Sequence, residues 1–177
     1  RPARSTPDIG RLLLDTTRAI TGNARLLPMT VTWLVAYENF VARQRLRHLA
    51  RAAALEERAT LGLLIDFAIA QGASEDLRLC SRDCEPLRSP GPLFEIHRRS
   101  DALLRLAESS THDIARRWGL WTPLPELKHD AIRPVEWILE HNPTLRERVV
   151  RKGDLRCSIL ETLRNDTDGE SPSESEL

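Results

Sequence analysis

The feature that most constrains the fold is the return of apolar residues every three or four positions along residues 9–118. Residues that start or stop helices stand between these runs, among them the pair Thr6-Pro7 and the glycines Gly72 and Gly119. This spacing puts one apolar face on each predicted helix, whereas half-buried strands would need strict alternation. We therefore expect an all-α protein.

Short connections join the first four predicted helices. These helices begin near Pro7, Asn23, Ala42 and Leu55, and Gly72 ends the fourth. Short loops force consecutive helices to lie antiparallel, so the pattern predicts a multi-helix bundle or stacked helical hairpins. Stacked hairpins would suggest a solenoid, but no internal repeat in residue type supports one.

Prolines and glycines organise the remainder of the chain. Residues 81–92 hold three prolines and Gly91 and predict a loop, and Leu93–His97 could form a short extended piece. A second proline-containing stretch, residues 121–127, marks the expected boundary between two parts. The first part is a helical body, residues 1–127, and the second is a helical C-terminal segment, residues 128–177.

Composition limits the partners that the chain can attract. It has 177 residues, of which 41% are hydrophobic, enough to bury a core. Its 26 basic and 26 acidic residues cancel, so no net charge draws it to nucleic acid or to a membrane. The charge is uneven, however, because residues 1–53 hold nine arginines and three acids. The longest apolar stretch, Leu61–Ala70, is too short to span a bilayer.

Three cysteines, an odd and sparse set, argue against a disulfide framework and for a reducing, cytoplasmic compartment. Cys80 and Cys84 form a C-x3-C pair with His97 downstream. Zinc needs four ligands, and the second pair is missing from the local sequence, although Cys157 or another histidine could complete the site in space. We favour two buried thiols and predict no cofactor.

No catalytic motif is present. The sequence lacks a HExxH metal site, a nucleophile elbow, a Walker loop and a dinucleotide-binding fingerprint. Three pairs place an imidazole beside a carboxylate: His112-Asp113, His129-Asp130 and Glu140-His141. Adjacent residues on a helix do not face each other, so these pairs are weak evidence for catalysis. The chain is predicted to be no enzyme and to take no small-molecule ligand.

Four tryptophans stand at Trp33, Trp118, Trp121 and Trp137. We expect them to be buried in the core or at a domain seam, with the sequence WGLW at 118–121 anchoring the two parts; a partner-binding role is the alternative. Asp66 interrupts an apolar helix and is expected to point off its buried face, because a buried aspartate would need a partner such as an arginine.

A basic stripe runs along the third predicted helix. Arg43, Arg47 and Arg51 follow at intervals of four residues and so share one helix face. Such a stripe can bind nucleic acid or an acidic partner. A solvated face opposite Leu46 and Leu49 is the favoured interpretation, because no aromatic residues interleave the stripe.

The C-terminal sequence LRCSILETLRNDTDGESPSESEL contains a helix ending near Asn165, a polar turn and a new helix start at Ser171. That start combines a capping box with proline at the first helical position. The segment, about residues 154–177, resembles the first two helices of bacterial winged helix-turn-helix regulators. The resemblance implies DNA binding through a recognition helix and a wing that would both follow Leu177.

Four basic residues would contact phosphates beside such a module. Arg148, Arg151 and Lys152 share one face of the preceding predicted helix, with Arg156 nearby. The alternative is a solvated helix face with a Glu147–Arg151 surface pair, followed by a disordered acidic tail.

Two functions therefore remain open. The first is a non-enzymatic, cytoplasmic DNA-binding or transcription-regulatory protein whose helical body dimerises or senses a partner. The second is a helical adaptor that binds another protein through a helix face or groove. Neither requires a membrane.

Overall fold

The computed structural model describes residues 7–142, 145–146, 149, 159–160 and 162–163, and over these residues the all-α prediction is confirmed. The α-helices are α1 (Ile9–Ala19), α2 (Leu26–Tyr37), α3 (Arg43–Arg51), α4 (Leu55–Ala70), α5 (Arg78–Ser81), α6 (Asp101–Ser109), α7 (Asp113–Arg117) and α8 (Val135–His141). Short 3-10 helices are η1 (Glu38–Phe40), η2 (Glu75–Leu77), η3 (Glu95–Arg99) and η4 (His129–Ala131). Most of the predicted helix-turn-helix segment lies outside the described residues.

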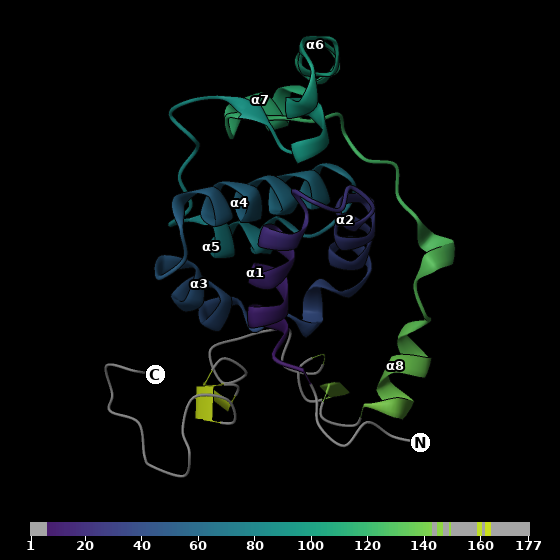
Figure 1. The fold of residues 1–177 in the computed structure, drawn as a ribbon. Helices are drawn as coiled ribbons and strands as arrows, with labels where there is room; N and C mark the ends of the chain where they lie inside the picture. The colour runs from purple at the N-terminus through teal and green to yellow at the C-terminus, as the bar shows by residue number, and fades with distance from the viewer. Residues whose placement is uncertain (1–6, 143–144, 147–148, 150–158, 161, 164–177) are drawn as a thin grey trace.

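Helix α4 lies at the centre of the fold (Figure 1). Its residues 59–65 are all buried, as are Phe67 and Ala68. Helices α1, α2, α3 and α5 pack on one side of it and α7 packs on the other. A helix that is apolar all round must be covered on every side, which explains this central place. Within the described part of the chain, no helix has both the length and the apolar character needed to cross a membrane.

Capping residues set the ends of several helices. The Asp8 carboxylate accepts a hydrogen bond from the Arg11 backbone N–H at the start of α1, two residues after the Thr6 suggested by the sequence. Ser100 caps α6 by accepting from the Leu103 N–H, as its position predicted. Gly72 ends α4 with φ +112°, a backbone conformation that favours glycine.

Two short parallel strands, β1 (Gly91–Pro92) and β2 (Leu120–Trp121), tie the predicted loop to the chain that follows α7. The expected extended piece Leu93–His97 is wrong over its second half, because η3 begins at Glu95. The Glu95 N–H donates to the Thr21 carbonyl at 2.9 Å, which turns the chain back toward the end of α1.

Asp66 fastens α7 onto α4. Its carboxylate is only 12% exposed and accepts hydrogen bonds from Trp118 Nε1 at 2.9 Å and from Arg78 Nη1 at 3.2 Å. Gly62, one turn earlier, leaves room for the indole, since a Cβ atom there would lie within 2.5 Å of three ring carbons of Trp118. The expectation that Asp66 points off the buried face is therefore wrong, because two donors satisfy it in place.

A buried ion pair joins the start of α1 to α3. The Arg45 side chain is 2% exposed, and its Nη2 lies 2.6 Å from Asp8 Oδ2. Arg45 Nη1 also donates to Thr162 Oγ1 at 3.3 Å, so a residue of the C-terminal segment reaches the same guanidinium.

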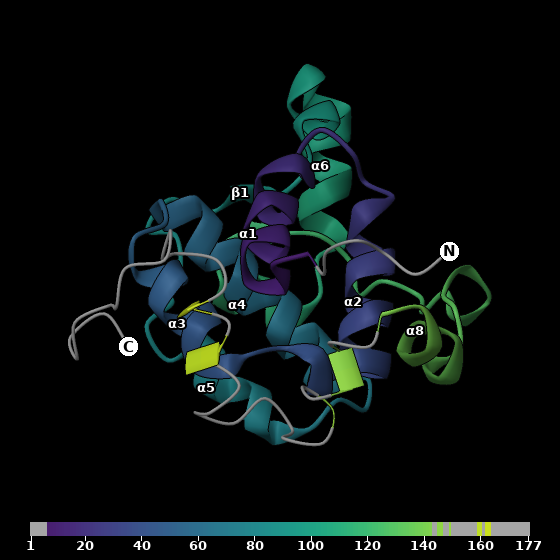
Figure 2. The ribbon, with the colours of Figure 1, turned by 90° about the horizontal axis from the view of Figure 1, so that it is seen from below.

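A second, smaller apolar cluster connects α8 to α2. Tyr37, Phe40 and Leu145 are buried in it, and Ile132 and Ile138 pack against them. Figures 1 and 2 both place α8 beside α2. Ile132, helix α8 and Leu145 thus pack on the helical body and complete one of its faces.

Candidate binding groove

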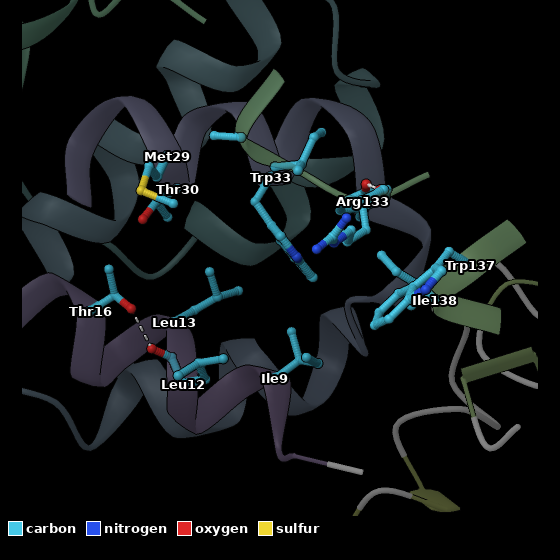
Figure 3. A pocket seen from close by; sticks show the side chains of 13 residues that line it. Ile9, Leu12, Leu13, Thr16, Met29, Thr30, Trp33, Arg133, Trp137 and Ile138 are labelled. Atoms are coloured by element: carbon cyan, nitrogen blue, oxygen red, sulfur yellow. Dashed lines mark hydrogen bonds between the residues drawn. The ribbon is translucent and has the colours of Figure 1, made fainter. Parts of the chain in front are cut away.

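An open apolar groove lies between α1, α2 and residues 131–138 (Figure 3), with a volume of about 440 Å³. Three parts of the chain line it. They contribute Ile9, Leu12, Leu13 and Thr16 from α1; Met29, Thr30, Trp33 and Tyr37 from α2; and Ala131, Ile132, Arg133, Trp137 and Ile138 from the third part.

The groove has a buried floor and an exposed apolar rim. Ile9 and Leu13 are 7% and 5% exposed, whereas Leu12 and Met29 are 52% and 43% exposed. The Trp33 indole points into the space from α2 (Figure 3). The neighbouring helices thus cover only part of the apolar face that was predicted for the first helix. The uncovered part of that face forms one wall of the groove.

Hydrogen bonds within the chain already occupy two of the hydroxyl groups in the lining. Thr16 Oγ1 donates to the Leu12 carbonyl at 2.7 Å (dashed in Figure 3), and the Tyr37 hydroxyl donates to the Arg133 carbonyl. Burial raises the pKa of Tyr37, and the nearby Glu136 carboxylate raises it further. The phenol therefore stays protonated at neutral pH and holds the third wall of the groove against α2.

Arg133 is the one charged side chain among the described residues that line the groove. Its guanidinium lies 5.5 Å from the centroid of the Trp137 ring, a cation–π arrangement. The Trp137 ring also stacks on His141, with centroids 4.1 Å apart. Within the described residues Arg133 makes no ion pair. The end of the groove at residues 133–141 is thus a fixed, positively charged aromatic edge.

Sequence reasoning missed this groove because its third wall, residues 131–138, lies about a hundred residues after the walls that α1 and α2 form. The one local signal was the spacing of Arg133, Trp137 and His141 at intervals of four. Trp137 is 43% exposed, so the expectation of burial is wrong for this tryptophan. Trp118, in contrast, is partly buried against α4. Both lie within residues 1–127, so this contact is inside the predicted helical body and does not join it to the second part.

The four predicted phosphate-binding residues, Arg148, Arg151, Lys152 and Arg156, have no described side chains, and the acidic tail lies outside the described residues too. DNA binding therefore stays a prediction. Its test is fluorescence anisotropy of duplex DNA titrated with salt, in which phosphate contacts would weaken steeply as the salt concentration rises.

The basic stripe of α3 faces acidic side chains of the same chain. Arg47 Nε and Arg51 Nε lie 2.6 Å and 2.8 Å from Asp83 Oδ2, and Arg43 Nη1 lies 3.8 Å from Asp76 Oδ2. The sequence suggested either a solvated face or a surface for nucleic acid or an acidic partner, and neither interpretation included these ion pairs within the chain. The stripe is an ion-pair seam between α3 and residues 76–83, and it stays partly solvated, because Arg51 and Asp76 are 55% and 74% exposed.

This seam makes stability depend on pH in the acid range. Hydrogen bonds from Arg47 and Arg51 lower the pKa of Asp83 from 3.8 to about 2. A carboxyl whose folded-state pKa is lowered stabilises the fold above its unfolded pKa and loses that contribution as pH falls through its folded pKa. We expect Asp83→Asn to be less stable than the wild type at neutral pH, with the difference shrinking between about pH 4 and pH 2. Urea unfolding across this range measures it, and an equal pH dependence in both proteins would contradict the assignment.

Cys80, Cys84 and His112 occupy structural positions. Burial raises the pKa of Cys80 to about 12 and that of Cys84 to about 11, so both thiols are protonated at neutral pH. His112 caps α7, its Nδ1 accepting from the Ile114 N–H at 3.2 Å. Over the described part of the chain, no group of three or more histidine, cysteine or acidic residues is placed to hold a metal ion.

Comparisons with known protein families, curated proteins and solved structures find no match to this chain. The class is therefore defined by what the fold and groove show: an all-α protein with an open, apolar groove that ends at an arginine–tryptophan edge.

Proposed function

We propose that the chain is a non-enzymatic helical adaptor that binds another protein through this groove. The observation that carries the proposal is the gathering of large exposed apolar side chains around a buried apolar floor. Leu12, Met29 and Trp137 come from three different elements and are 52%, 43% and 43% exposed. Apolar surface of this kind, framed by polar residues, is typical of protein interaction sites.

A protein partner fits the groove better than a small molecule does. Small ligands are held in recesses that enclose most of their surface and that present a few polar groups to orient them. Here the apolar rim is exposed, and the Thr16 and Tyr37 hydroxyls are already bonded within the chain. Among the described residues, the lining also contains no carboxylate, imidazole or thiol that could act as a nucleophile or a general base. These features support binding rather than catalysis.

Substitutions on the rim test the proposal. A displayed library of helical peptides, each with an apolar stripe, is selected against the wild-type protein. We expect Leu12→Glu or Met29→Glu to weaken the selected binders at least about tenfold, because each puts a charge on the contact surface. Both side chains are exposed, so the free energy of unfolding should change by no more than about 0.5 kcal/mol.

The matched control is Leu106→Glu. Leu106 is 57% exposed on α6, far from the groove lining, and its substitution should leave peptide affinity unchanged. Selected peptides that bind the Leu12→Glu and Met29→Glu variants as well as they bind the wild type would contradict the proposal. So would a selection that yields no binder.

A further inference from the structure

We propose that the groove binds an amphipathic α-helix of a partner protein, and that this helix carries an acidic residue that meets Arg133. The inference rests on the proposed function and specifies the chemistry of the partner. Three properties of the groove lead to this proposal: its walls are largely helical, they are about two helical turns long, and Arg133 lies at one end.

The walls favour a helix over an extended strand. Two of the three walls are α-helices, whose backbone donors and acceptors are bonded within the helix. An extended peptide would find no sheet edge here and would bury its own N–H and C=O groups unbonded against apolar side chains. A helix satisfies its backbone internally and presents only side chains to the groove.

The length of the walls matches two turns of helix. The lining residues of α1 run from Ile9 to Thr16, and those of α2 from Met29 to Tyr37. At 1.5 Å per residue these walls are about 10–12 Å long. A partner helix with apolar residues at positions i, i+3, i+4 and i+7 presents a stripe of about the same length.

The placement of Arg133 selects an acidic partner residue. Of the lining residues that the structure describes, it is the one that carries a charge, and it makes no ion pair with any of the other described residues. Its side chain lies over the exposed Trp137 ring, while its carbonyl is bonded to Tyr37, so the cation stays at one end of the groove. The nearby Glu136 is not part of the lining. A carboxylate at the end of the partner's apolar stripe would therefore lie beside a guanidinium that pairs with no carboxylate of the described residues.

The experiment compares matched peptides of about 16 residues, a length that favours helix formation. Each carries the same leucine stripe, with glutamate, glutamine or lysine at the flanking positions. Anisotropy titrations are run with the wild type, Arg133→Gln and Arg133→Glu. We expect the wild type to prefer the glutamate peptide over the glutamine peptide by about two- to fivefold, the size of an exposed ion pair. Arg133→Gln should lose this preference, and Arg133→Glu should prefer the lysine peptide.

The outcomes separate the two proposals. If all three peptides bind equally well and Leu12→Glu weakens them, the groove binds helices but the acidic specificity is overturned. If no peptide binds the wild type, or if binding is insensitive to Leu12→Glu, both proposals are overturned. If the protein is a dimer that Leu12→Glu dissociates, a second copy occupies the groove and the acidic partner helix is overturned.

Discussion

Replacing Asp8 with asparagine is expected to lower the free energy of unfolding by about 3 kcal/mol, the low end of the range for breaking a buried ion pair. The carboxylate lies 2.6 Å from the guanidinium of Arg45, and the two side chains are 11% and 2% exposed. Asparagine caps a helix about as well as aspartate does, so this substitution removes the charge and keeps the cap of α1. Asp8→Ala removes both and should cost about 1 kcal/mol more.

Urea or thermal unfolding of the two variants measures these differences. Asp15→Asn is the matched control: Asp15 lies on the same helix, is 67% exposed and pairs with Arg18 at the surface, so its loss should cost less than about 1 kcal/mol. Combining Asp8→Asn with Arg45→Met should recover part of the loss, because the buried charge is then removed as well. A cost for Asp8→Asn no larger than that of Asp15→Asn would show that the buried pair contributes little.

Gly62→Ala should destabilise the protein by about 1–3 kcal/mol, the usual cost of overpacking a core. The direction of the change in the free energy of unfolding is informative, because replacing glycine with alanine inside a helix ordinarily stabilises a protein by about 1 kcal/mol. Here the added Cβ would overlap the six-membered ring of the Trp118 indole. The indole cannot withdraw freely, since its Nε1 donates to Asp66 at 2.9 Å.

Gly22→Ala provides the comparison, because the nearest atom to a Cβ at that position is 3.9 Å away, and its effect should be small. Trp118→Phe shortens the ring that causes the overlap. We therefore expect the double variant Gly62→Ala, Trp118→Phe to cost less than the sum of the two single changes. Simple additivity in a double-mutant cycle, or a stabilising effect of Gly62→Ala alone, would contradict this account of the contact.

Local features of the chain could be predicted because each one depends on neighbours in sequence. The end of α4 follows from the backbone freedom of Gly72, and the start of α6 follows from the hydroxyl of Ser100. The all-α class follows from the spacing of apolar residues, which needs no knowledge of tertiary contacts.

Tertiary partners could not be predicted in the same way. The burial of Asp66 depends on Arg78 and Trp118, which lie 12 and 52 residues further along the chain. Two arginines of the α3 stripe, Arg47 and Arg51, likewise pair with Asp83, which lies 36 residues after Arg47. Nothing in the local sequence of either site indicates which distant side chain will arrive there.

The groove could not be predicted from the local sequence either. The apolar face of α1 could be predicted, but whether a neighbour covers Leu12 depends on how α2 and residues 131–138 pack around it. That side chain is 52% exposed, and its exposure is a property of helix arrangement rather than of residue type.

The bond from the Tyr37 hydroxyl to the Arg133 carbonyl spans 96 residues, and this separation bears on biosynthesis. Translation proceeds at about 5–20 residues per second, so the third wall of the groove leaves the ribosome roughly 5–20 seconds after α2 does. A nascent chain that already holds α1 and α2 has an unfinished groove without the Arg133–Trp137 edge. Capture by the proposed acidic partner helix would consequently wait until residues 131–138 have left the ribosome.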